Sequence, residues 1–290
     1  MSTIATLAVL GLGTGAVYAV FALGYAAVYD VLGLMNLAHG DVLMVATFAC
    51  LGVWEATASP ALAVLAGMAV GAVAGAVVDQ TAFRPLRFTG DALAPLVTSL
   101  GAALVLRNLT QWRFGAADRA FPDLLPGGEL RLAGAGLPVA APLAIAAAVA
   151  VALAGQRFLV RTRPGLIVTA VAEDLTAARL VGLPVALAVA SVYAIAGVIA
   201  GAGGILYAAT FETLKLSLGW SATVIAFSAA VIGARASLVG AVAGGLGLGL
   251  ATTFLSYGLP SGYREAVSFT VLACVLVAWP DRRSAAVRSD

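Results

Sequence analysis

Charge is what this chain lacks most. Asp, Glu, Lys and Arg make up only 10% of its 290 residues, whereas soluble domains carry about 25%. A stretch of about 18 or more residues with few or no charges is long enough to cross a bilayer as a helix. The shortage of charge therefore excludes a water-soluble fold and predicts a polytopic membrane protein. The uncharged stretches are Thr3–Tyr29, Ala56–Val78, Leu132–Gln156, Leu180–Phe211 and Ala236–Tyr263.

Residues that could couple transport to protons, bind ATP or act in catalysis are also scarce. The chain has a single His, His39, and a single Lys, Lys215, and no Asp, Glu or His stands at the centre of a long uncharged run. Proton-coupled carriers usually need such an ionisable group along the path. The sequence also lacks a G-x-x-x-x-G-K-[ST] loop, so it has no Walker lysine for ATP. We expect no cofactor, metal or catalytic residue in this chain, and any ATP and Mg²⁺ would be bound by another subunit.

The uncharged runs and the Gly and Pro residues between them predict an all-α bundle. We expect a single membrane domain over residues 1–290, with about eight or nine membrane segments, some of them broken or re-entrant. Two polar regions interrupt it, one at about Arg107–Gly136 and one at about Gln156–Leu183. Two short interruptions, Asp30–Asp41 and Gly233–Gly240, follow the first and seventh predicted spans. Irregular backbone at membrane depth must be buried in protein or face water, and broken helices often mark a substrate path.

The arginines predict the orientation. Placing Gln156–Leu183 in the cytoplasm puts ten basic residues inside and six outside, as the positive-inside rule requires. The N-terminus would then face outward, the C-terminus inward, and Arg107–Gly136 would form a long extracytoplasmic loop.

Small residues recur at four-residue spacing in several predicted spans. Such spacing lets two helix backbones approach closely. The pairs would serve packing within one bundle or, alternatively, a dimer or pore face. They are Gly11/Gly15, Gly67/Gly71/Gly75, Gly197/Gly201, Gly240/Gly244 and Gly245/Gly249.

The first informative segment is Leu32–Met44, in which polar residues interrupt an apolar region. Asn36 and Asp41 are suited to capping helix ends, and Gly40 to a close contact. One interpretation is a capped turn between two spans, with His39 as a hydrogen-bonding residue. The other is that Asn36, His39 and Gly40 line or support a substrate path.

The second informative segment runs from Pro164 to Pro184, with Gly165 near its start and Gly182 near its end, as at many helix boundaries. Between them, an apolar stripe at spacings of four and three predicts a short amphipathic helix. That helix would either only join two spans or dock a partner at the cytoplasmic surface. The stripe consists of Val171, Leu175 and Ala178.

These segments belong to a longer series of motifs. Gly15-Ala-Val-Tyr18-Ala precedes Asn36-Leu37-Ala38-His39-Gly40-Asp41. In this the chain resembles the shorter, high-affinity type of the branched-chain amino acid ABC transporter permease family, which typically shows Asn-Phe-Ala-His-Gly-(Glu/Asp) there. Leu37 departs from the usual Phe and Asp41 from the commoner Glu. The resemblance extends from about Leu10 to Pro280 and includes Phe83–Arg87, Ala94–Gly101 and Ala177–Gly182.

The resemblance implies one permease subunit of an importer in the bacterial cytoplasmic membrane. An extracytoplasmic solute-binding protein would deliver an amino acid, and a second permease subunit, either a paralogue or a second copy of this chain, would complete the path. ABC ATPase subunits would dock at the coupling segment. The resemblance assigns coupling to Glu173, Leu175, Ala178, Arg179 and Gly182.

Three alternatives stay open on sequence. Relatives in the same family move urea or short amides. A self-sufficient channel or a Na⁺-coupled carrier would need no ATPase, because carbonyl groups alone can bind Na⁺. A membrane enzyme is a third class. Nucleic acid is not an expected partner, and the weak formal charge of +2 gives no information about it.

Overall fold

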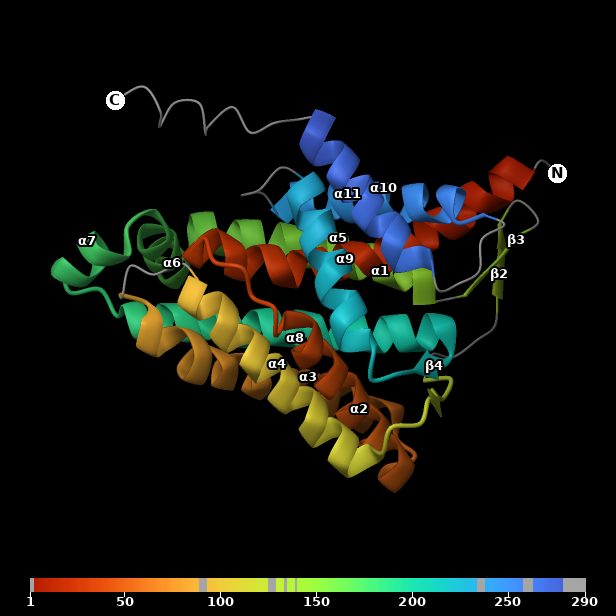
Figure 1. Cartoon of the computed structure of the whole chain (residues 1–290), viewed down its shortest axis with the longest axis horizontal. Coiled ribbons are helices and arrows are strands. Elements are labelled where there is room, and N and C mark those ends of the chain that lie inside the picture. Colours follow the sequence, from red (N-terminus) through yellow and green to blue (C-terminus); the bar gives the residue numbers. More distant parts are fainter. Residues whose placement is uncertain are drawn as a thin grey trace.

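The chain forms an elongated bundle of helices in a computed structural model (Figure 1). The structure describes residues 3–88, 93–124, 129–132, 135–138, 140–233, 238–257 and 263–278. The long helices are α1 (Thr3–Leu32), α2 (His39–Thr57), α3 (Pro60–Val78), α4 (Leu93–Phe114), α5 (Ala140–Arg161), α8 (Val185–Phe211) and α10 (Leu238–Leu255). The shorter helices are α6 (Arg163–Glu173), α7 (Leu175–Leu180), α9 (Leu218–Ile232) and α11 (Arg264–Ala278).

Seven helices of the described residues are long and apolar enough to cross a membrane. They are the seven long helices, with α3 extended to Leu86 by a π-helical turn (Asp79–Phe83) and a 3₁₀ turn (Arg84–Leu86). Helix α9 is apolar but shorter. This confirms the predicted all-α polytopic membrane protein.

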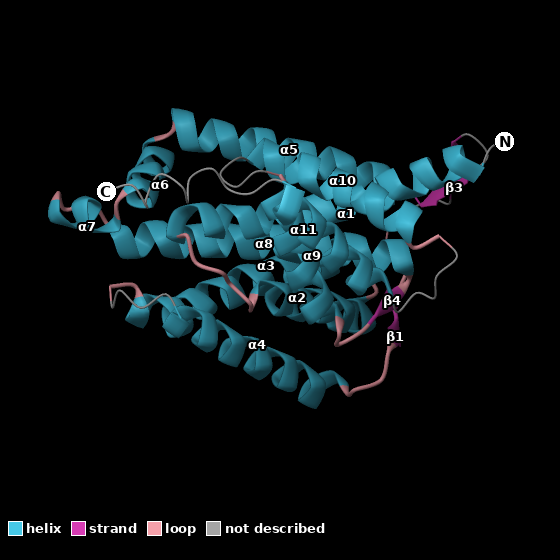
Figure 2. Ribbon diagram, turned by 45° about the horizontal axis from the view of Figure 1, so that its top comes forward, coloured by secondary structure: helices cyan, strands magenta, loops and turns pink. Residues whose placement is uncertain are grey.

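In the described ranges, the strands form two small antiparallel pairs. β1 (Arg119–Ala120) pairs with β4 (Thr213–Leu214), with Arg119 opposite Leu214. β2 (Glu129–Leu132) pairs with β3 (Ala135–Pro138). All four strands lie at one end of the bundle, where α1 also begins, and α6 and α7 lie at the opposite end (Figures 1 and 2). We call these the β end and the α7 end.

Glycines bring helix backbones into direct contact at two crossings. Between α3 and α8, a Cβ added to Gly197 would fall on the carbonyl oxygen of Gly71, and one added to Gly75 on that of Tyr193. Between α1 and α10, a Cβ on Gly15 would lie 2.8 Å from the carbonyl oxygen of Leu246. Packing of small residues is a main source of helix association in membranes, where no water drives apolar surfaces together. These glycines therefore serve contacts within this bundle.

Two predicted boundaries were wrong. A polar region was predicted to begin at about Arg107, but α4 continues to Phe114, so the loop begins about eight residues later than expected. The reason is that Arg107 has a buried carboxylate partner, described below, and does not need water. Residues 156–161 were likewise assigned to a polar segment but form the last turns of α5. The second predicted interruption, Gly233–Gly240, lies partly outside the described residues.

We expect Gly197→Leu to separate α3 from α8, because the new side chain would enter the backbone of α3. Overpacking a core costs about 1–3 kcal/mol, and a clash with backbone belongs at the upper limit. The apparent melting temperature of the detergent-solubilised protein should fall. Gly247→Leu is the matched control, since nothing lies within 4 Å of a Cβ at Gly247 on α10. Equal melting temperatures for the two variants would contradict the role of this crossing.

Candidate functional site

The chain between α1 and α2, residues 33–38, turns back into the bundle. Gly33 has a φ of +64°, and its N–H donates to the carbonyl of Tyr29 at 2.8 Å, which ends α1. Asn36 is buried, and its side-chain oxygen accepts from the N–H of Ala38 at 3.0 Å, just before α2 begins. This bond spans two residues and forms a local turn. The expectation that Asn36 caps a helix is corrected, because the N-cap residue of α2 is Ala38 and the helix has no side-chain cap there. We call residues 33–38 the broken segment.

Side chains from α4 and α9 satisfy the backbone of the broken segment. Ser99 Oγ on α4 accepts from the N–H of Leu37 at 3.3 Å. The single hydroxyl proton of Thr223 on α9 is shared between the carbonyls of Leu37 at 3.2 Å and Gly219 at 3.0 Å. The same Thr223 oxygen accepts from the N–H of Gly40 at 3.0 Å. Backbone groups at membrane depth have no water to bond with, so they require such partners. The broken segment is thus held in place by two other helices.

Gly40 lets α9 approach the start of α2. A Cβ at this position would fall on the carbonyl oxygen of Gly219 and on Thr223. This confirms the expectation of a close contact at Gly40.

Asp41 forms a buried ion pair with Arg107. Its two carboxylate oxygens accept from Arg107 Nε at 3.0 Å and from Nη2 at 3.1 Å. The Asp41 side chain is 1% exposed and that of Arg107 is 29% exposed. Two parallel hydrogen bonds of this kind are strong and fix orientation. The prediction that Asp41 caps a helix is therefore corrected, because its carboxylate joins α2 to α4 instead.

His39 is enclosed by α1. Its ring lies edge-on to Tyr25, with 5.8 Å between ring centroids, and a Cβ on Gly24 would lie 3.0 Å from its Nε2. That nitrogen is buried and has no hydrogen-bond partner among the described residues. Asn36, His39 and Gly40 are thus all in the packed interior between α1, α2 and α9. Their role in a substrate path stays a prediction.

The predicted coupling helix is two helices. Thr162 caps α6 by accepting from the N–H of Gly165 at 3.1 Å. Asp174 then caps α7 by accepting from the N–H groups of Thr176 and Ala177 at 2.8 and 2.9 Å. A cap residue has extended backbone, so Asp174 interrupts the single helix that the apolar stripe predicted. Gly182 ends α7 with a φ of +80°.

The two helices bury part of the predicted stripe. Val171 is 0% exposed and Ala178 is 4% exposed, whereas Glu173 and Arg179 face outward. At the tip of α7, Leu180 and Val181 are 82% and 75% exposed. These two residues lie outside the predicted stripe, although an apolar pair before a helix-ending glycine is visible in the sequence. An exposed apolar pair at the far end of a membrane bundle is suited to contact with another protein.

A second buried ion pair lies where α3 ends. Arg87 Nη2 donates to Asp79 Oδ1, and the two side chains are 3% and 1% exposed. In the π-helical turn between them, the ring of Phe83 packs on Tyr193 of α8 with centroids 5.4 Å apart. The charge of Arg87 is therefore neutralised inside the bundle.

The α7 helix contacts this region directly. The guanidinium of Arg179 lies 4.9 Å from the centroid of the Phe88 ring. Phe88 follows Arg87 in the chain, so α7 contacts the residue next to the ion pair at the end of α3. Across the part of the chain that the structure describes, no three His, Cys, Asp or Glu residues gather into a metal site.

Comparison with known proteins covers nearly the whole chain. The family described as "Branched-chain amino acid transport system / permease component" matches residues 7–276. The high-affinity branched-chain amino acid transport system permease protein BraD of Pseudomonas aeruginosa is 30% identical over 94% of this chain and 92% of its own. The corresponding protein LivH of Escherichia coli K12 is 29% identical over 83% of this chain and 82% of its own.

A solved structure supports the fold. "PsaBC from Streptococcus pneumoniae in complex with Fab" matches with a TM-score of 0.52 over 97% of this chain and 94% of that chain. At 11% identity the likeness concerns the fold alone. The match to the family over residues 7–276 shows that the chain belongs to the permease components of branched-chain amino acid transport systems.

Proposed function

We propose that this chain is the membrane-spanning permease subunit of an ATP-driven importer for branched-chain or other small amino acids. The observation that carries the proposal is the family match over residues 7–276. The lack of a Walker lysine in the sequence fits a subunit whose ATP is hydrolysed by a partner. The other partners in this proposal are a second permease subunit and an extracytoplasmic solute-binding protein.

We further propose that the α7 end faces the cytoplasm in the inner membrane. Five exposed arginines lie in the segments at this end, and the positive-inside rule favours cytoplasmic arginine. The N-terminus, at the β end, is then outside. The arginines are Arg84, Arg157, Arg161, Arg163 and Arg179.

The tip of α7 is the docking point for the ATPase in this proposal. Leu180 and Val181 are exposed, while Ala178 and Val171 anchor the two short helices to the bundle. Motion of α7 would reach the end of α3 through the contact between Arg179 and the Phe88 ring, which lies next to Arg87 of the Asp79–Arg87 pair. The packing of the Phe83 ring on Tyr193 would extend it to α8.

The broken segment supports the path in the same proposal. Asn36, His39 and Gly40 hold the irregular chain at depth between α1 and α9, where a change in helix packing would move it. Amino acid uptake by His39→Ala equal to that of the wild type over a pH series would remove His39 from this role.

Reconstitution tests the function as a whole. We expect the chain to co-purify with ATPases encoded beside it, and ATP hydrolysis in liposomes to rise with amino acid and binding protein together. Permeases for urea or short amides would respond to those solutes instead. Accumulation of solute by the isolated chain, with no ATPase present, would indicate a self-sufficient carrier and contradict the proposal.

We expect Val181→Asp to uncouple the transporter, because a charge would enter an apolar contact. Central contact residues are often worth at least about 2 kcal/mol, so ATPase binding should weaken roughly 30-fold. Co-purification and substrate-stimulated ATP hydrolysis measure the loss. Leu166→Asp makes a similar change at an exposed site on α6 and should be near neutral. Equal effects of the two variants would argue against α7 as the docking point.

We expect Arg87→Gln to destabilise the protein by about 3–5 kcal/mol, since the buried Asp79 carboxylate loses its partner. Adding Asp79→Asn should recover much of this loss, because no buried charge then remains. Melting temperatures of the single and double variants give the coupling between the two residues. The control is Arg84→Gln at an exposed residue three positions away, which should change little. Additive losses in the double variant would show that the pair does not act as a unit.

A further inference from the structure

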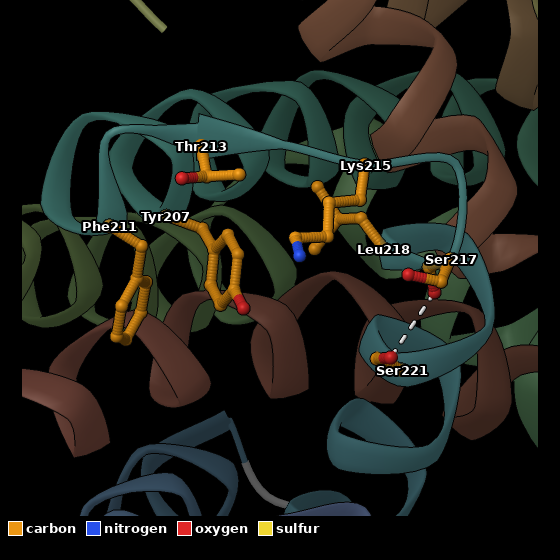
Figure 3. A pocket seen from close by; sticks show the side chains of 7 residues that line it. All are labelled: Tyr207, Phe211, Thr213, Lys215, Ser217, Leu218 and Ser221. Atoms are coloured by element: carbon orange, nitrogen blue, oxygen red, sulfur yellow. Dashed lines mark hydrogen bonds between the residues drawn. The ribbon is translucent and has the colours of Figure 1, made fainter. Parts of the chain in front are cut away.

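A cavity of about 210 Å³ lies at the β end, where α8 ends and α9 begins (Figure 3). Sites for drug-sized ligands measure about 300–1,000 Å³, so this cavity is suited to a smaller solute. It is lined by Tyr207, Phe211, Thr213, Lys215, Ser217, Leu218 and Ser221. None of these residues belongs to the broken segment or to the coupling segment.

One wall of the cavity is aromatic and another carries hydroxyl groups. The rings of Tyr207 and Phe211 lie 4.5 Å apart between centroids. Ser217 and Ser221 stand on the other side of Lys215 (Figure 3). The cavity therefore offers an apolar surface beside polar and charged groups, which is typical of sites that orient a small ligand.

The only lysine of the chain lines this cavity, and its counter-charge is Asp118, which is not itself one of the lining residues. Lys215 Nζ donates to Asp118 Oδ2 at 2.8 Å, and both side chains are about half exposed, at 52% and 57%. This hydrogen bond, and then the charge of Asp118, raises the pKa of Lys215 above its ordinary value. The lysine therefore stays cationic. An ion pair this exposed is weak, so a ligand that replaces both partners can open it.

An α-amino acid carries a carboxylate and an ammonium group on one carbon. Such a zwitterion can replace the Lys215–Asp118 contact on both sides, with its carboxylate on the lysine and its ammonium on the aspartate. An apolar side chain would then lie against Tyr207 and Phe211. An anion or a cation alone would satisfy only one of the two charges.

We propose that this cavity is an outer binding site for a zwitterionic amino acid with an apolar side chain. The inference rests on the proposed function, since it gives the imported solute a first position on the permease. It assigns carboxylate recognition to Lys215, ammonium recognition to Asp118 and the apolar contact to Tyr207 and Phe211.

The test uses the assembled transporter in nanodiscs, without its solute-binding protein, and saturation-transfer NMR to detect weak binding. The probes are leucine, 4-methylpentanoate, which lacks the ammonium group, and leucinamide, which lacks the carboxylate. In Lys215→Met we expect the signals of leucine and 4-methylpentanoate to fall at least fivefold, while that of leucinamide persists. In Asp118→Asn we expect the reverse, with loss of leucine and leucinamide and retention of 4-methylpentanoate.

Arg119→Met is the matched control. Arg119 belongs to the same small sheet as the cavity wall, but its partners, Glu55 at 2.9 Å and the carbonyl of Phe114, do not line the cavity. We expect it to bind all three probes as the wild type does. Loss of leucine in Arg119→Met to the same extent, loss of all three probes in both cavity variants, or no leucine signal in the wild type would overturn the proposal.

ATP-driven uptake by the same complex in liposomes, with its solute-binding protein added, separates the two proposals. Amino acid uptake without any leucine signal at the permease would remove the cavity site and leave the proposed function in place. The charge-dependent binding pattern, without uptake of any amino acid, would support the cavity site and remove the proposed function.

Discussion

The fold depends on how the backbone of residues 33–38 obtains hydrogen bonds inside a bilayer. Thr223 on α9 bonds to both Leu37 and Gly40, and Ser99 on α4 bonds to Leu37. A polar backbone group left unpaired in hydrocarbon costs several kcal/mol, so these side chains make the irregular segment possible. The Asp41–Arg107 ion pair then joins α2 to α4 beside it. Residues 33–38 and helices α2, α4 and α9 are thereby connected to one another.

The need of buried polar groups for partners inside the bilayer also explains why the spanning segments contain few charged residues. Asp41, Asp79, Arg87 and Arg107 all lie within or beside spanning segments, and each is paired. A buried ion pair adds little net stability compared with apolar packing, but removal of one partner is costly. Such pairs therefore tie specific helices together, α2 to α4 in one case and the turns that follow α3 in the other.

The two ends of the bundle have different chemistry. The α7 end presents arginines and an exposed apolar pair, Leu180 and Val181. The β end presents a small cavity with a lysine–aspartate pair beside two aromatic rings. Between them, α3 and α8 run in backbone contact through Gly71 and Gly197. Displacement at one end would be carried along this closely packed pair, because packed helices move as rigid elements.

The sequence by itself determined the membrane class, the helical fold, the interruption after the first span and the short segment between Pro164 and Pro184. Composition and the spacing of charges, Gly and Pro record these features directly, because bilayer thickness and backbone hydrogen bonding act on local stretches of chain. Only the tertiary structure decided the partners of Asp41, Asp79 and Lys215, the splitting of the coupling helix at Asp174, and the use of the glycines within the bundle. Asp41 and Arg107 are 66 residues apart, and a charge that is neutralised across that separation looks in the sequence like a charge in a loop.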